Sequence, residues 1–289
     1  MKRGRSKQKR VVPVVQQAPY RQLKNPYQPM LVFSDDEIES IHRSSLKVLC
    51  ETGMDIQSSR AVEILKREGA MVDSNGVRVR FDPDFIMEKI STTPNEFTLH
   101  GRHKDRDVHI GGRSVAYCMV SSAPNVSDLD RGRVPGNFED YCNLIRLGEA
   151  LNTVHVQCGY PVEPCDLDVS IRHLQAVSAS ARLCTKPLYG YSIGSERMLD
   201  AIEIIRIGRG IDEATLLQEP SITTVVNANS PLVYDEALLE GAIEMAERNQ
   251  PVIYTPFTLA GAMAPITVAG ALVQQNAEAL AGLAFHQCI

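Results

Sequence analysis

The chain has 289 residues, of which 44% are hydrophobic and 22% are charged, and its formal net charge is −5. These values are typical of a globular protein with one large domain or two ordinary ones. No stretch approaches 18 consecutive apolar residues, and this excludes a transmembrane helix. We expect a cytoplasmic protein that does not bind membranes.

The seven cysteines are scattered, and no two form a C-x-x-C pair. Their odd number in a chain of this length argues against a disulfide framework, so reduced thiols packed as small apolar side chains are expected. Cys158 and Cys165 flank an expected loop, but their spacing fits no standard zinc pattern. No metal site is predicted.

Residues 1–32 are predicted to be a disordered, basic and Pro-rich tail. The first ten residues carry six Lys or Arg and no acid. Subtracting these six positive charges from −5 leaves −11 for the rest of the chain. So acidic a body argues against a nucleic-acid-binding protein.

Residues 33–112 predict a mixed α/β region of small elements. Ser34, followed by Glu37, is a capping signature for a helix that Gly53 ends. Ser58 or Ser59 caps a second helix, which ends at Gly69. The remaining expected elements are a strand over 77–81, a short helix opened by Pro83, and strands over 96–102 and 107–112.

Residues 113–289 show a regular alternation of strand-like and helical segments, which recurs about every 30–40 residues, the size of a βα unit. The strand-like segments are 114–120, 153–160, 186–192, 221–228 and 251–257. The helical segments that follow them are 138–151, 170–183, 196–210, 235–249 and 265–287. Such alternation indicates a parallel sheet with right-handed crossovers.

The parallel sheet has two possible closures, an open doubly wound sheet or a (β/α)8 TIM barrel. No G-x-G-x-x-G follows the first strand, and the strands are semi-polar, which favours the barrel. The predicted fold class is therefore α/β, a TIM barrel with an N-terminal α/β extension. Five βα units are visible where a closed barrel needs about eight, so we expect a truncated barrel and a fragment of a longer protein.

In a TIM barrel the active site lies in the loops at the carboxyl ends of the strands. The candidate binding residues in these loops are Tyr160, Glu163, Asp166, Tyr189, Tyr191, Asn227, Ser230, Phe257 and Thr258. Other roles are open for all of them, because Tyr and Phe on strands often belong to a core, and Asn, Ser, Asp and Glu after a strand often cap the next helix.

These loops contain no obvious nucleophile or general base. They hold no His, since His155 lies within a strand, and His173 and His286 lie in helices. Lys186 precedes Pro187 at the amino end of its strand, away from the expected site. No G-x-S-x-G or H-E-x-x-H motif is present. The loops therefore suit a protein that positions a substrate for an external reagent.

Four stretches carry a family resemblance, which runs from about Phe33 to the last residue. They are "SDDEIESIHRSSLKVLCETGMDI", "SAPNVSDLDRGRVPGNFEDYCNLIRLGEALN", "NANSPL" and "TPFTLAGAMAPITVAGALVQQNAEALAG". Together they resemble the trimethylamine methyltransferase family. The resemblance implies a barrel longer than this chain, and transfer of a methyl group from a tertiary or quaternary amine to the Co(I) of a separate corrinoid protein. The cobalt is then the nucleophile, and a cobalamin-type corrinoid is supplied by that partner rather than bound tightly by this chain.

The resemblance also implies roles for particular residues. Tyr160, Tyr189, Tyr191 and Phe257 would form an aromatic cage for a methylated ammonium group, and Glu163 and Asp166 its counter-charges. Gly261, Ala262 and Ala264, in a loop of small residues, would let the partner's corrin ring approach closely; tight packing at a helix start is the other explanation of this loop.

The final motif looks closer to the relatives that lack pyrrolysine. In the members that contain it, the pyrrolysine position lies beyond the point that corresponds to Ile289. We also expect a homo-oligomer. Two other functions stay open. One is a TIM-barrel lyase or hydrolase acting on a small polar substrate. The other is a non-catalytic, truncated barrel that binds amines.

Overall fold

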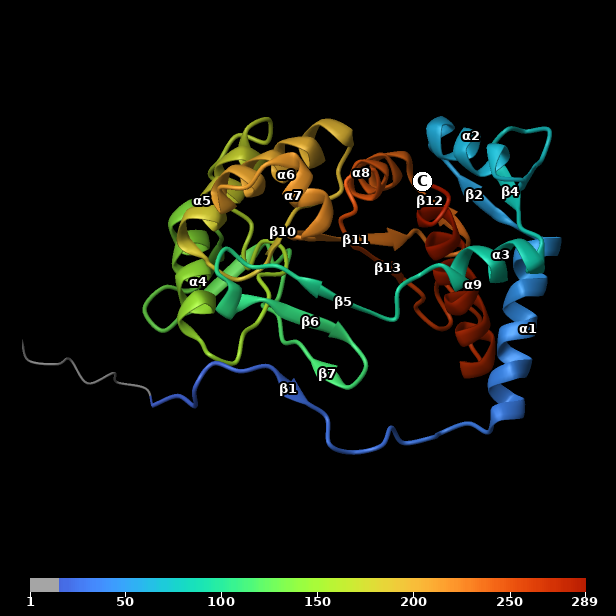
Figure 1. The fold of residues 1–289 in the computed structure, drawn as a ribbon, viewed down its shortest axis with the longest axis horizontal. Coiled ribbons are helices and arrows are strands. Elements are labelled where there is room, and N and C mark those ends of the chain that lie inside the picture. Colours follow the sequence, from blue (N-terminus) through green and yellow to red (C-terminus); the bar gives the residue numbers. More distant parts are fainter. Residues whose placement is uncertain (1–15) are drawn as a thin grey trace, which may run out of the picture.

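The computed structural model describes residues 16–289, and their fold is mixed α/β, as predicted (Figure 1). At its centre is a three-stranded parallel sheet in the order β10–β11–β13. These strands span Leu188–Tyr189, Ile222–Ala228 and Val252–Pro256. Within the described part of the chain the strands form several small sheets and no closed barrel.

Two further segments extend the parallel arrangement beyond β10. Cys118 forms a parallel bridge with Val156, and the Gln157 amide donates a hydrogen bond to the Pro187 carbonyl over 3.0 Å. The five strand-like segments of the sequence therefore lie side by side in chain order. The segments at 114–120 and 153–160 contain less strand than predicted. In them the structure has only β7 (Ser114–Val115) and the single bridge between Cys118 and Val156.

The helices that follow these segments begin and end within three residues of the predicted limits. They are α4 (Phe138–Ala150), α5 (Arg172–Leu183), α6 (Ser195–Arg209), α8 (Glu236–Ala246) and α9 (Val268–His286). Alternate residues of the strands pack against them, because successive strand side chains point to opposite faces. Ile222 joins the core under α5 and α6, whereas Val226 joins the core under α8 and α9. A short helix, α7 (Glu213–Gln218), was not predicted.

The N-terminal region contains the predicted helices α1 (Asp35–Glu51), α2 (Ser59–Arg67) and α3 (Pro83–Ser91). The Ser34–Glu37 capping box is confirmed, as are the caps at Ser58 and the proline at the start of α3. Strands β2 (Met54–Ile56), β3 (Met71–Val72) and β4 (Arg78–Arg80) form a sheet with β12 (Val233–Tyr234), in the order β12–β2–β4–β3. Because β12 lies in the loop after β11, this region is joined directly to the central sheet.

Two hairpins lie outside these sheets. One, β5 (Glu96–Leu99) with β6 (Val108–Gly111), was predicted as two strands, and its Leu99 and Val108 pack on Val156. Lys104–Arg106 form a 3-10 turn between them. The other, β8 (Asn125–Asp128) with β9 (Gly132–Pro135), falls in a segment predicted to be a loop. Its turn is stabilised by the Asp128 carboxylate, which accepts from the Asp130 and Arg131 amides.

Of the segment predicted to be a disordered tail, residues 1–15 lie outside the described residues. From residue 16 onward the chain lies extended along the molecule and makes specific contacts (Figure 1). Strand β1 (Leu23–Lys24) pairs antiparallel with β7. The Gln22 side chain donates to the His109 carbonyl over 2.6 Å, and His155 Nε2 lies 3.0 Å from the Arg21 carbonyl.

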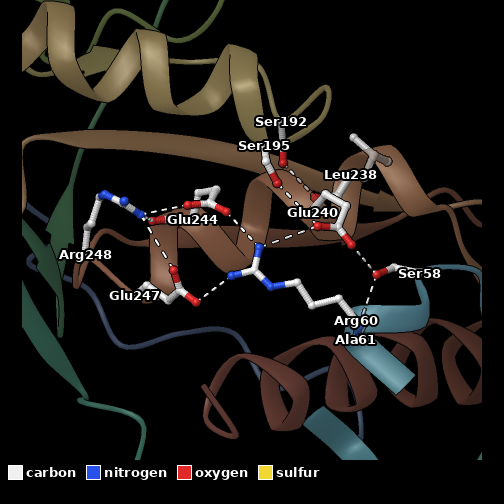
Figure 2. Close-up of polar contacts among 10 residues, drawn as sticks. All are labelled: Ser58, Arg60, Ala61, Ser192, Ser195, Leu238, Glu240, Glu244, Glu247 and Arg248. Atoms are coloured by element: carbon white, nitrogen blue, oxygen red, sulfur yellow. Dashed lines mark hydrogen bonds and ion pairs between the residues drawn. The ribbon is translucent and has the colours of Figure 1, made fainter. Parts of the chain in front are cut away.

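An ionic network fastens the N-terminal region to α8 (Figure 2). The Arg60 guanidinium, on α2, donates to Glu244 over 2.8 Å and to Glu247 over 2.6 Å. Glu240 accepts from the Ser58 hydroxyl at 2.6 Å and from the Ser195 hydroxyl, at the start of α6, at 3.3 Å. This network, the α2–α8 clamp, thus joins three helices.

Across residues 16–289 none of the helices has the length and apolarity to traverse a bilayer.

Candidate functional site

A cavity of about 420 Å³ lies beyond the carboxyl ends of the second and third strand-like segments, beside the first turns of α5 and α6. We call it the α5–α6 cavity. It contains three of the residues predicted from the sequence, Tyr160, Glu163 and Tyr191. Its full lining is Ser122, Tyr160, Glu163, Val169, Arg172, His173, Val177, Tyr191, Ile193 and Arg197.

Three of the predicted aromatic residues form a continuous tyrosine cluster. The Tyr160 and Tyr191 rings meet edge-on with centroids 4.5 Å apart, and Tyr189 and Tyr191 meet in the same way at 5.1 Å. Tyr141, on α4, extends the cluster by packing edge-on against Tyr160 at 5.4 Å. Burial raises the pKa of Tyr160 and of Tyr191, so both phenols stay neutral at physiological pH.

Hydrogen bonds hold Tyr191 over the end of the second segment. Its hydroxyl accepts from the Tyr160 amide at 3.1 Å and lies 2.6 Å from the Ser122 hydroxyl. Gly159 makes this reach possible, because a Cβ there would stand 3.0 Å from the Tyr191 hydroxyl and 2.5 Å from Ser121. Gly159 also has a φ of 74°, which favours glycine.

The cavity lining carries two guanidinium groups and one carboxylate. Arg172 Nη1 lies 3.9 Å from the Glu163 carboxylate, Nη2 donates to the Leu167 carbonyl over 2.9 Å, and Nε is buried without a partner among the described residues. Burial raises the pKa of Glu163, and the positive charge of Arg172 opposes that rise. His173 Nε2 is 2.9 Å from the Asp200 carboxylate, and its Nδ1 has no partner within residues 16–289.

The other predicted residues lie outside the α5–α6 cavity. The Asp166 carboxylate accepts from the Phe138 amide at 2.8 Å, at the start of α4, so it caps a helix. Ser230 is buried and donates over 2.6 Å to Glu278 of α9. Tyr189 lies on the sheet face opposite Leu188, and its hydroxyl accepts from the Val225 amide at 3.2 Å. Burial raises the pKa of Tyr189 to about 12.

A second group of predicted residues gathers at the carboxyl ends of β11 and β13. Asn227 is exposed on the sheet face opposite Val226, where its side-chain oxygen accepts from the Thr255 hydroxyl. Phe257 follows β13 and is 55% exposed, and Thr258 is half-buried beside it. The structure therefore divides the predicted set between the α5–α6 cavity and this open face of the sheet.

The loop of small residues between β13 and α9 is ordered by its own backbone. The amides of Ala262, Met263 and Ala264 donate to the Leu259 carbonyl, and the Gly261 amide donates to the Ala264 carbonyl at 2.9 Å. Gly261 and Ala262 are exposed, while Ala264 is half-buried. Around them Leu259 and Ile266 are 51% and 83% exposed, so the loop presents an apolar surface.

No group of three or more His, Cys, Asp or Glu side chains within residues 16–289 is placed to hold a metal ion. Cys165 is exposed and Cys158 half-buried, and neither is bonded in a disulfide.

Three polar residues of the cavity were not predicted, namely Arg172, His173 and Arg197. The first two open α5, and Arg197 is in the first turn of α6. In a parallel βα array the helix after a strand begins near that strand's carboxyl end, so the first turns of these helices were the place to look for site residues. Unlike the other seven α-helices of the described residues, α5 and α6 have no side-chain N-cap.

Comparison with known proteins identifies a family and several relatives of this chain. A family model described as trimethylamine methyltransferase matches residues 1–289. A glycine betaine methyltransferase of Desulfitobacterium hafniense strain Y51 is 34% identical over 258 residues, which cover 89% of this chain and 53% of that protein. A proline betaine:corrinoid methyltransferase of Eubacterium limosum is 26% identical over 266 residues, or 89% of this chain and 53% of the relative.

A trimethylamine methyltransferase of Desulfitobacterium hafniense strain DCB-2 is 27% identical over 258 residues, which cover 88% of this chain and 51% of the relative. The chain thus spans about half the length of the curated relatives it matches. The match over its full length, together with the relative at 34% identity, shows that the chain belongs to the trimethylamine methyltransferase family.

Proposed function

We propose that the protein transfers a methyl group from a tertiary or quaternary amine to the Co(I) of a separate corrinoid protein. The observation that carries this proposal is the α5–α6 cavity, where two tyrosine rings and one carboxylate meet in a chain of this family. Such groups suit a methylated ammonium ion, which is attracted both by the faces of aromatic rings and by negative charge.

We propose further that the five βα units belong to a (β/α)8 barrel. The side-by-side, parallel order of the five segments supports this closure, because consecutive strands of a TIM barrel are neighbours throughout. The position of the cavity and of Asn227 at the carboxyl ends of the strands fits the side of the barrel on which such enzymes place their sites.

In this proposal the protein binds and orients the amine. Tyr160 and Tyr191 surround the methylated nitrogen, and the Glu163 carboxylate balances its charge. A quaternary nitrogen already carries the positive charge of a leaving group, so no side chain has to protonate it. The strand-end loops that were predicted to hold the site contain no His and no obvious nucleophile, which is consistent with this chemistry.

The corrinoid, bound by its own protein, supplies the cobalt nucleophile. The loop of Gly261, Ala262 and Ala264 fits the approach of such a group, since Gly261 and Ala262 are exposed and carry no side chain larger than a methyl. The exposed apolar residues around them, Leu259 and Ile266, would pack against the surface of the partner protein.

The test is a methyl-transfer assay that follows the absorbance change from Co(I) to methyl-Co(III) in a reduced corrinoid protein. Formation of methyl-cobalt is expected with a tertiary or quaternary amine, and a large loss of rate is expected for Tyr160→Ala. Tyr117→Ala, a change at an exposed tyrosine outside the cavity, is the matched control. Turnover of the amine without any corrinoid protein would contradict the proposal.

A further inference from the structure

The charges that line the α5–α6 cavity do not match a simple cation. Two guanidinium groups, of Arg172 and Arg197, face one carboxylate, of Glu163, so the lining is positive overall when His173 is neutral. A trialkylammonium ion bound here alone would gain from Glu163 and the tyrosines but would be repelled by the arginines.

Both guanidinium groups have unused capacity to donate hydrogen bonds. Arg172 donates one hydrogen bond, from Nη2 to the Leu167 carbonyl over 2.9 Å, but its Nη1 is 3.9 Å from Glu163, beyond hydrogen-bond distance, and its buried Nε has no partner within the described residues. Arg197 is half-buried in the cavity wall and forms neither a salt bridge nor a side-chain hydrogen bond with any of residues 16–289. Burying a guanidinium N–H without an acceptor is unfavourable, so the Arg172 Nε points to a ligand that supplies one, and Arg197 is free to donate to the same ligand.

We propose that Arg172 and Arg197 form a subsite for the carboxylate of a zwitterionic substrate whose ammonium end lies against Tyr160, Tyr191 and Glu163. A planar guanidinium binds a carboxylate with two parallel hydrogen bonds, which makes arginine suited to this group. The inference rests on the proposed function, because it assumes that the cavity is the amine site. It adds that the protein discriminates by the anionic end of the substrate.

The two ends of the ligand would lie against different walls of the same cavity. Tyr160 and Tyr191 come from the strand ends, whereas Arg172 and Arg197 come from the first turns of α5 and α6. The uncapped amides of these turns add partial positive charge on the same side. An amine without a carboxylate leaves this wall unpaired, and is therefore expected to bind more weakly.

Three probes of similar size separate the two ends in calorimetric binding experiments on the whole protein. Glycine betaine carries both groups, tetramethylammonium carries only the cation, and 3,3-dimethylbutyrate carries only the carboxylate. Arg197→Gln is expected to weaken the binding of glycine betaine and of 3,3-dimethylbutyrate by about 10- to 100-fold, through the loss of a charged hydrogen bond. It should not weaken the binding of tetramethylammonium, because it removes a charge that repels this cation. Arg197→Lys should restore part of the loss.

Arg206→Gln is the matched control, because it removes the same charge from the same helix outside the cavity, where Arg206 pairs with Glu203. Unchanged affinity of folded Arg197→Gln and Arg172→Gln variants for glycine betaine would overturn the carboxylate subsite while leaving the amine site in place. Binding of 3,3-dimethylbutyrate with no binding of tetramethylammonium would support the subsite and contradict the amine cage of the proposed function. Circular dichroism of each variant confirms that it is folded.

Discussion

Glu163 is the single carboxylate in the lining of the α5–α6 cavity, and its charge depends on the pH. Burial raises its pKa, and Arg172 limits that rise, so the carboxylate is protonated at a higher pH than an exposed glutamate. Affinity for tetramethylammonium is therefore expected to fall as the pH is lowered towards the raised pKa of this carboxyl group, because the counter-charge is lost. Calorimetric titrations at several pH values measure this fall.

The Glu163→Gln variant should bind tetramethylammonium weakly and with no pH dependence over the same range. An acid whose pKa is raised by folding costs stability while it is ionised, so its contribution improves as the pH falls, and the Gln variant should not be less stable at neutral pH. Asp166→Asn, at the other predicted counter-charge, is the control and should keep the wild-type affinity. An unchanged pH profile in Glu163→Gln would contradict this assignment.

Glu278 shows how one buried carboxylate organises a loop. It is fully buried in α9 and accepts from the Ser230 hydroxyl at 2.6 Å, the Leu232 amide at 2.8 Å and the Gln274 side chain at 2.9 Å. Glu278→Ala leaves these donors unpaired and should lower the free energy of unfolding by roughly 2–4 kcal/mol, whereas Glu278→Gln should cost about 1 kcal/mol. Urea denaturation measures both, and equal values would show that the hydrogen bonds contribute little.

At the scale of elements, the helices could be predicted much better than the strands. Caps such as Ser34, Ser58 and Asn137 act on the adjacent turn, so local sequence is enough to place the start of a helix. Strand pairing depends on partners far along the chain. Strand β12 pairs with β2 across about 180 residues of sequence, and β1 pairs with β7, so neither could be inferred from a local pattern.

The α2–α8 clamp is an element-scale contact whose contribution can be measured (Figure 2). The Arg60 side chain is 39% exposed, so solvent screens its ion pairs, but it serves three glutamates, and Glu244 among them is largely buried. Arg60→Ala is expected to lower the free energy of unfolding by about 1–2 kcal/mol. Arg43→Ala, at an exposed pair with Glu39, should cost no more than about 0.5 kcal/mol.

A double-mutant cycle of Arg60→Ala with Glu244→Ala isolates their interaction from the effects of each truncation. A coupling energy near zero would mean that the N-terminal region is held mainly by the core beneath it. That core includes Val62 and Leu65 of α2, and Leu239 of α8.

At the scale of the whole molecule, the sequence was sufficient to predict the order of the βα units but not which residues line the α5–α6 cavity. Tyr160, Glu163 and Tyr191 were predicted because they lie at or after the ends of strands, where sites of parallel sheets lie, and the structure places all three in one cavity. Arg172 and Arg197 lie in the first turns of two helices. From the sequence alone, an arginine at such a position could equally face solvent or a ligand. Only the packing of α5 against α6 shows that both face one cavity.

The exposed loop between β13 and α9 permits a last prediction that concerns the whole molecule and its partner. Ala262 is exposed and lies more than 60 residues of sequence away from Arg197, outside the cavity lining. Ala262→Trp places a bulky ring where we propose that the corrinoid approaches, so the rate of methyl-cobalt formation should fall at least about tenfold, while affinity for the amine stays unchanged. A parallel Ala269→Trp variant, at an exposed position in the first turn of α9, tests how far this surface extends.

Because the substitution leaves the amine cavity intact, its effect separates partner approach from substrate binding. The expected kinetic signature is a raised apparent KM for the corrinoid protein, with no change in the calorimetric affinity for glycine betaine. If Ala262→Trp instead transfers methyl groups at the wild-type rate, the partner does not contact this loop. The corrin ring would then have to reach the substrate across the open sheet face that carries Asn227 and Thr255.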